Sequence, residues 1–238
     1  MHMMIMLGIL SFVFFAALTL MCVFREKLFN PLVNYAFILA CAVCFFCWNY
    51  AAYEWGWLKK GLMTFNNISP LICTVILFTP FMSRRVKSFA YSATALLGFG
   101  MFLALYISPG AEYFGNMRYT ATFMNISEAT CHLVMSLYGF YLILSGKVRL
   151  NFKSLGKALV FIYLSIGFGV FLNWCFHLSY FGMNMYGSYS IYFIDIFGSF
   201  EATFLAYLLG VLGVVLSGYL VGVFLDRFTR YRWYNLMP

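Results

Sequence analysis

The sequence predicts an all-α, polytopic membrane protein with seven transmembrane helices, and three observations lead to this fold class. First, 64% of the 238 residues are hydrophobic and 9% are charged, and a soluble domain of this length cannot bury so much apolar surface. Second, the apolar residues form continuous stretches close to the roughly 20 residues that a helix needs to cross about 30 Å of hydrocarbon. Third, Lys and Arg are concentrated in every second loop, so basic loops alternate along the chain with loops that contain few basic residues.

We count seven such stretches in a single domain, residues 1–238. The continuous apolar pattern favours helices over a β-barrel, whose strands would alternate. The predicted spans cover residues 3–24, 34–53, 65–82, 88–107, 123–144, 155–175 and 203–225. The long connection at 176–202 has no Lys or Arg and is rich in aromatic residues, so we expect an outward-facing loop that lies in the membrane interface.

The distribution of Lys and Arg predicts the orientation. Loops on one side of the predicted bundle contain twelve of the fifteen basic residues, and the other side contains only Lys59, Lys60 and Arg118. The twelve are Arg25, Lys27, Arg84, Arg85, Lys87, Lys147, Arg149, Lys153, Lys157, Arg227, Arg230 and Arg232. Basic loops remain in the cytoplasm, so we expect a cytoplasmic C-terminus and an outward N-terminus in a cell membrane. The net charge of +8 therefore follows the topology and does not indicate nucleic acid, and the partners we expect are membrane lipids.

Two ionisable residues lie inside the fifth predicted span, where charge is costly. Glu128 and His132 are four residues apart, which puts them on one helix face where the carboxylate can orient the imidazole. Asn125 lies about one turn further out. One interpretation is a buried polar pair that joins helices, and the other is a catalytic site that also needs a nucleophile.

Cys73 is the candidate nucleophile. It lies about as far from the outer end of the third predicted span as His132 does from that of the fifth, so the two can meet. Pro70 removes a helical donor one turn earlier, and Asn66 adds polarity at this mouth. A buried thiol needs a base to form the reactive thiolate, and a histidine backed by a carboxylate supplies one. Thr74 is an alternative nucleophile.

Cys41, Cys44 and Cys47 form a separate stripe within the second predicted span. They resemble metal ligands in spacing, but structural zinc sites normally lie in turns and have four ligands. We therefore predict no metal and no cofactor. In the last predicted span Ala206, Gly210, Gly218 and Gly222 fall at multiples of four residues, which favours close packing of another helix of the same chain.

Several motifs resemble the YwaF-type bacterial membrane proteins and the related eukaryotic transmembrane protein 164 group. They are Ser69-Pro70-Leu71-Ile72-Cys73, His132, the segment FKSLGKAL at 152–159, Asn173 and the segment GMNMY at 182–186. The resemblance covers residues 24–186 and implies a seven-helix fold in a bacterial cytoplasmic membrane. The eukaryotic relatives are regarded as cysteine-dependent phospholipid acyltransferases, which implies Cys73 as the acyl acceptor and His132 as its base.

The sequence leaves three functions open. The first is a membrane-embedded acyltransferase or acyl hydrolase that uses Cys73, His132 and Glu128 on lipid esters. The second is a small-solute or proton-linked transporter in which Glu128 and His132 carry protons. The third is a membrane protein without chemistry. The residues expected to bind substrate are Asn66, Asn125, Asn173, Asn184 and Tyr186. The oligomeric state is not predicted.

Overall fold

The computed structural model describes residues 3–54, 68–111, 123–177, 180 and 196–234, and all regular elements within them are helical. This confirms the all-α class. The α-helices are α1 (Met3–Val23), α2 (Pro31–Glu54), α3 (Ile68–Phe78), α4 (Arg84–Ala111), α5 (Phe123–Leu144), α6 (Phe152–Phe176) and α8 (Phe200–Tyr234). Two 3-10 turns, η1 (Arg25–Phe29) and η4 (Thr79–Phe81), follow α1 and α3.

Six of the seven predicted spans are helices that are long and apolar enough to cross a membrane. The third is shorter than predicted in the described part of the chain, because α3 and η4 together cover only Ile68–Phe81. The predicted start of this span, residues 65–67, lies outside the described residues. The helices α4, α6 and α8 also extend beyond their predicted limits, and the added residues include Arg84 at the start of α4 and Lys153 at the start of α6.

Short polar side chains fix the starts of two helices. Asn30 Oδ1 accepts a hydrogen bond from the Leu32 amide at 3.0 Å, and Pro31 occupies the first turn of α2, where its missing N–H costs nothing. At α6, Asn151 and Ser154 each bond the other's backbone amide in a capping box, which satisfies two amides that the helix cannot.

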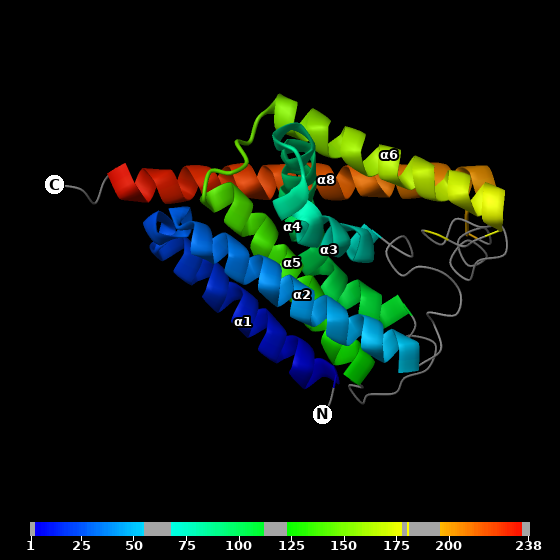
Figure 1. The fold of residues 1–238 in the computed structure, drawn as a ribbon, viewed down its shortest axis with the longest axis horizontal. Coiled ribbons are helices and arrows are strands. Elements are labelled where there is room, and N and C mark those ends of the chain that lie inside the picture. Colours follow the sequence, from blue (N-terminus) through cyan, green and yellow to red (C-terminus); the bar gives the residue numbers. More distant parts are fainter. Residues whose placement is uncertain (1–2, 55–67, 112–122, 178–179, 181–195, 235–238) are drawn as a thin grey trace.

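The core lies along α4 and α5, which have the largest buried shares of the long helices, 56% and 78%. In Figure 1, α6 and α8 lie along the upper side of the view and α1 and α2 along the lower side, with α5 between them. The inner helices meet at two glycines. A Cβ on Gly139 would lie 2.8 Å from Gly98 Cα and from the Thr94 carbonyl oxygen, so only glycine permits this approach.

The small residues of α8 divide into two groups. A Cβ on Gly218 would overlap the carbonyl of Leu96 on α4, and one on Gly222 would come within 2.9 Å of Ile143 on α5. These two glycines pack inside the protein, as predicted. Gly210, in contrast, faces open space, so the predicted internal role holds for only part of the series.

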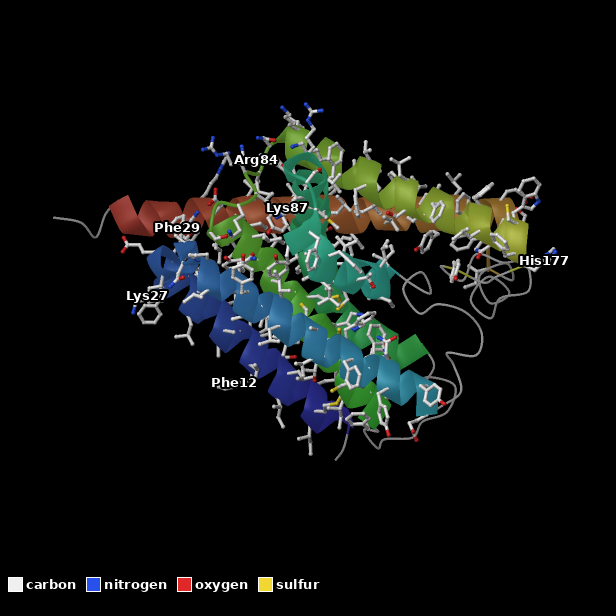
Figure 2. The ribbon with its side chains drawn as sticks, in the orientation of Figure 1. Phe12, Lys27, Phe29, Arg84, Lys87 and His177 are labelled. Carbon is white, nitrogen blue, oxygen red and sulfur yellow. The ribbon has the colours of Figure 1, made fainter. Side chains whose placement is uncertain are left out.

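One end of the bundle gathers the loop after α1 and the end of α8. Arg25 in η1 forms an ion pair of 2.6 Å with Asp226, donates to the Asp226 carbonyl and also bonds the Thr229 hydroxyl. Figure 2 shows Lys27 and Arg84 toward this end, whereas His177, at the end of α6, lies at the opposite end. Arg25, Lys27 and Arg84 therefore lie toward one end of the bundle, which we call the basic end.

Candidate functional site

The polar centre of the molecule is His132, on α5. Its side chain is 1% exposed, and both ring nitrogens have partners. Nδ1 lies 2.9 Å from the backbone carbonyl oxygen of Glu128, and Nε2 lies 2.8 Å from Ser69 Oγ on α3. A carbonyl oxygen can only accept, so Nδ1 must carry the proton. In the neutral imidazole, Nε2 is then an acceptor aimed at the Ser69 hydroxyl.

This arrangement has the parts of a nucleophile–base pair. The Ser69 hydroxyl donates to the imidazole, and the main chain at Glu128 holds the ring in one tautomer, as a third group does in hydrolases that use a serine and a histidine. The predicted proximity of residues 128 and 132 is present, but the partner that Glu128 offers the ring is its backbone carbonyl. Helical geometry makes that contact, since residues four apart stack along one face.

Cys73 occupies the next turn of α3 and faces a different partner. Its Sγ lies 3.7 Å from Cys131 Sγ and 3.8 Å from the backbone carbonyl oxygen of Cys41, and its side chain is fully buried. The structure therefore brings His132 to Ser69 and Cys73 to Cys131, as two successive contacts between α3 and α5. The predicted depth match placed the correct helices together, but four residues of α3 separate the thiol from the residue that meets the imidazole.

Ser69 was not among the predicted site residues, although it begins the motif Ser69-Pro70-Leu71-Ile72-Cys73. A signal was available: Ser69 lies one turn before Cys73, so it shares the face of α3 that was expected to meet α5. A count of residues along a span locates depth only to about one turn, or about 5.4 Å. The neighbouring hydroxyl Thr74 instead donates to the carbonyl of Pro70 in its own helix.

Trp48 completes the inner wall of the site. Its indole ring lies 5.7 Å from the His132 ring, centroid to centroid, and its side chain is nearly buried. The indole Nε1–H has no hydrogen-bond partner among the described residues. A buried N–H without an acceptor is costly, so the site offers one strong donor to an oxygen atom of a ligand.

The predicted substrate-binding residues fall into three groups. Asn125 is buried on α5, one turn from Glu128. Asn173 on α6 binds the backbone of Tyr180, with its Oδ1 2.6 Å from the Tyr180 amide nitrogen and its Nδ2 2.9 Å from the carbonyl oxygen. These bonds give Asn173 a structural task, because they tie the chain after α6 back onto that helix. Asn66, Asn184 and Tyr186 lie outside the described residues.

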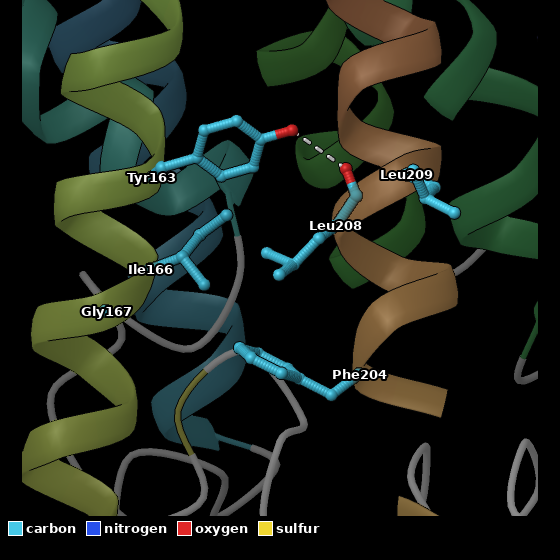
Figure 3. Close-up of a pocket in the computed structure, with 6 residues that line it drawn as sticks. All are labelled: Tyr163, Ile166, Gly167, Phe204, Leu208 and Leu209. Atoms are coloured by element: carbon cyan, nitrogen blue, oxygen red, sulfur yellow. Dashed lines mark hydrogen bonds between the residues drawn. The ribbon is translucent and has the colours of Figure 1, made fainter. Parts of the chain in front are cut away.

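A hollow lies between α6 and α8 (Figure 3) and has a volume of about 320 Å³. Its lining is Tyr163, Ile166, Gly167, Phe204, Leu208 and Leu209, with the Tyr163 hydroxyl bonded to the Leu208 carbonyl at 3.0 Å. No nucleophile paired with a base lines it. This groove therefore lacks the paired hydroxyl and imidazole that Ser69 and His132 provide.

Among the described residues, no three His, Cys, Asp or Glu side chains are grouped so that they could hold a metal ion. All seven cysteines are free thiols, and within the Cys41, Cys44 and Cys47 stripe only Cys41 is fully buried.

Comparison with protein-family models, curated protein sequences and solved structures finds no match to this chain. The resemblance to the YwaF-type proteins therefore stays a prediction, and the argument for function rests on the geometry.

Proposed function

We propose that the chain crosses the membrane seven times, with the basic end in the cytoplasm and the N-terminus outside. The Arg25–Asp226 ion pair supports this count, because it joins the C-terminal end of α1 to the C-terminal end of α8. An even number of crossings must therefore separate them. The helices α2, α4, α5, α6 and α8 supply five, so α3, with the chain that precedes it, supplies the sixth. Its short described length is compatible with a helix that begins part-way into the bilayer.

We propose further that the protein is a membrane-embedded acyltransferase or acyl hydrolase acting on lipid esters, with Ser69 as nucleophile and His132 as base. The observation that carries this proposal is the 2.8 Å contact between Ser69 Oγ and His132 Nε2, with Nδ1 fixed by the Glu128 carbonyl. Lipid esters are the substrate class that suits it, because the site lies among helices whose outer surfaces face hydrocarbon.

The reaction follows from these positions. Ser69 Oγ attacks the ester carbonyl carbon as His132 Nε2 takes the hydroxyl proton, and the resulting tetrahedral oxyanion needs hydrogen-bond donors. Trp48 Nε1–H is the unsatisfied donor beside the imidazole. His132 then returns the proton to the departing alcohol, which leaves an acyl-serine. A lysolipid hydroxyl or water, deprotonated by the same imidazole, attacks that ester and restores Ser69.

A labelling experiment tests this assignment. Purified protein in phospholipid nanodiscs is treated with a lipid-tailed fluorophosphonate, which phosphonylates activated serines, and the modified peptide is located by mass spectrometry. We expect modification at Ser69 and loss of that modification in His132→Ala. Transfer of a labelled acyl chain from phospholipid to lysolipid should fall at least about 100-fold in Ser69→Ala and in His132→Ala.

Two controls separate chemistry from folding. Ser92→Ala removes another buried serine, one that bonds only within α4, and should retain full transfer. Cys73→Ala should also retain transfer, because its thiol contacts Cys131 and Cys41 and not the imidazole. Transfer that survives in Ser69→Ala but is lost in Cys73→Ala would overturn the assignment and return the nucleophile to the thiol.

A proton-linked transporter is the second candidate, because polar groups continue along α5 beyond the site. Ser136 donates to the Gly98 carbonyl at 2.6 Å, and the Tyr138 hydroxyl bonds Asn34 at 3.1 Å. Such a column of buried hydroxyls and an imidazole can relay protons. Proton flux into liposomes that is lost in His132→Ala, together with no acyl transfer by the unaltered protein, would favour this candidate.

A further inference from the structure

Two helices begin together at the basic end of the bundle. Lys157, in the second turn of α6, donates from Nζ to Ser88 Oγ in the second turn of α4. Its ammonium group also lies 5.7 Å from the centroid of the Phe89 ring. These contacts fix the starts of α4 and α6 against each other.

Further cations lie on the same two faces. Arg84 is four residues before Ser88, and Lys153 is four residues before Lys157, so each shares the face of its neighbour. Lys87, which precedes Ser88 in the sequence, brings the number of polar residues in this set to five. The positive ends of both helix dipoles also point to this place, because it is where both helices begin. We call the set Arg84, Lys87, Ser88, Lys153 and Lys157 the basic cluster.

The basic cluster has no protein counter-charge in the described part of the chain. The first turns of α4 and α6 contain no acidic residue. Among the described residues, the acids at this end are Glu26 and Asp226, and Asp226 is engaged by Arg25 in the ion pair that joins η1 to α8. Cations brought together without an acid repel one another, and a bound anion removes that cost.

Exposed aromatic side chains border the basic cluster and identify the class of anion. Phe81 precedes Arg84 and is 84% exposed, and Phe152 precedes Lys153 and is 85% exposed. Large apolar side chains beside lysines and arginines are typical of the boundary between headgroups and acyl chains. A free anion in water would gain nothing from such a rim, whereas a lipid presents phosphate and hydrocarbon together.

We propose that the basic cluster is a binding site for the headgroup of an anionic phospholipid in the cytoplasmic leaflet. Lys153, Lys157 and Arg84 hold the phosphate oxygens, Ser88 orients Lys157, and the acyl chains lie against Phe81 and Phe152. The site is independent of the Ser69–His132 pair and does not depend on acyl-transfer activity.

Native mass spectrometry of the full chain, released from micelles with added lipid, tests the proposal. The probes are phosphatidylglycerol and phosphatidylcholine of the same acyl length. We expect phosphatidylglycerol to bind more tightly, and the double variant Lys153→Gln/Lys157→Gln to weaken its binding about tenfold or more. The matched control Lys147→Gln/Arg149→Gln removes the same charge from an exposed loop at the same end and should weaken binding less than about threefold.

Three results would overturn the proposal: equal loss in both double variants, which would mean diffuse attraction to positive charge; equal affinity for the two lipids; or displacement of phosphatidylglycerol by millimolar inorganic phosphate. If the double variant does not fold, Lys153→Gln alone decides between these outcomes, because Lys153 is exposed.

Discussion

The inner and outer helices of this protein differ in burial and in composition, because the inner helices are more buried and the outer helices are more apolar. In α5, 78% of the membrane-spanning stretch is buried, whereas the figure is 17% in α1 and 22% in α8. The outer helices are the more apolar because lipid surrounds them, and α5 holds Glu128, His132 and Ser136 because other helices surround it. In a membrane protein the least apolar span is therefore the one to search for chemistry.

The largest expected effect on stability comes from breaking the contact between α4 and α5. Leucine in place of Gly139 would force its Cβ into Gly98 Cα and the Thr94 carbonyl, and backbone cannot move aside as a side chain can. We expect a loss of about 3 kcal/mol in the free energy of unfolding, or failure to fold. Unfolding in mixed micelles, followed by far-UV circular dichroism, measures the change.

Gly210→Leu is the matched control on the outer surface. A Cβ at Gly210 meets nothing within 4 Å, so the leucine side chain extends into lipid and stability should stay within about 0.5 kcal/mol. A similar loss in both variants would show that the distinction between inner and outer helices does not govern stability.

The next effect concerns the ion pair at the basic end. Asp226→Ala would leave the largely buried Arg25 guanidinium with only the Thr229 hydroxyl and the backbone carbonyl oxygen of residue 226. We expect a loss of about 2 kcal/mol, less than for a fully dry pair, since the end of the bundle borders water. The double variant Arg25→Met/Asp226→Leu should regain most of it. A double variant as unstable as the single one would mean that the charge itself is required there.

Most of the fold could be predicted from sequence, and the site only in part. The length and apolar content of the stretches were enough to predict six membrane-spanning helices correctly. The predicted ends were wrong where a helix is longer than its apolar stretch, as at the start of α4. The choice of α5 as the site helix also followed from sequence, since an uncompensated Glu128 or His132 in hydrocarbon is too costly. The contact of His132 with Ser69 instead of Cys73 was beyond it, because the axial offset of α3 against α5 depends on tertiary contacts such as that between Cys73 and Cys131.

A smaller effect compares one serine from each class of helix. Ser136 is fully buried and donates across helices to the Gly98 carbonyl at 2.6 Å, whereas Ser217 bonds the Gly213 carbonyl within α8. Ser136→Ala should cost about 1 kcal/mol in the free energy of unfolding, and Ser217→Ala should have almost no effect. The same unfolding measurement applies, and equal costs would contradict the comparison.

The smallest effect is expected in the groove between α6 and α8, the outer counterpart of the polar contacts on α5. Tyr163→Phe removes the hydroxyl bonded to the Leu208 carbonyl. That carbonyl lies inside α8 and also accepts a helical hydrogen bond, so the substitution leaves no acceptor without a partner. We therefore expect a loss of about 0.5 kcal/mol or less in the free energy of unfolding, close to the average for hydrogen bonds between membrane helices.

Tyr138→Phe on α5 is the matched inner variant. It removes the hydroxyl bonded to the buried Asn34 side chain and should cost about twice as much, because an amide oxygen is then left in an apolar interior. If Tyr163→Phe were the more destabilising of the two, α6 would depend on this single bond for its attachment to α8, and the outer helices would not be held mainly by apolar packing.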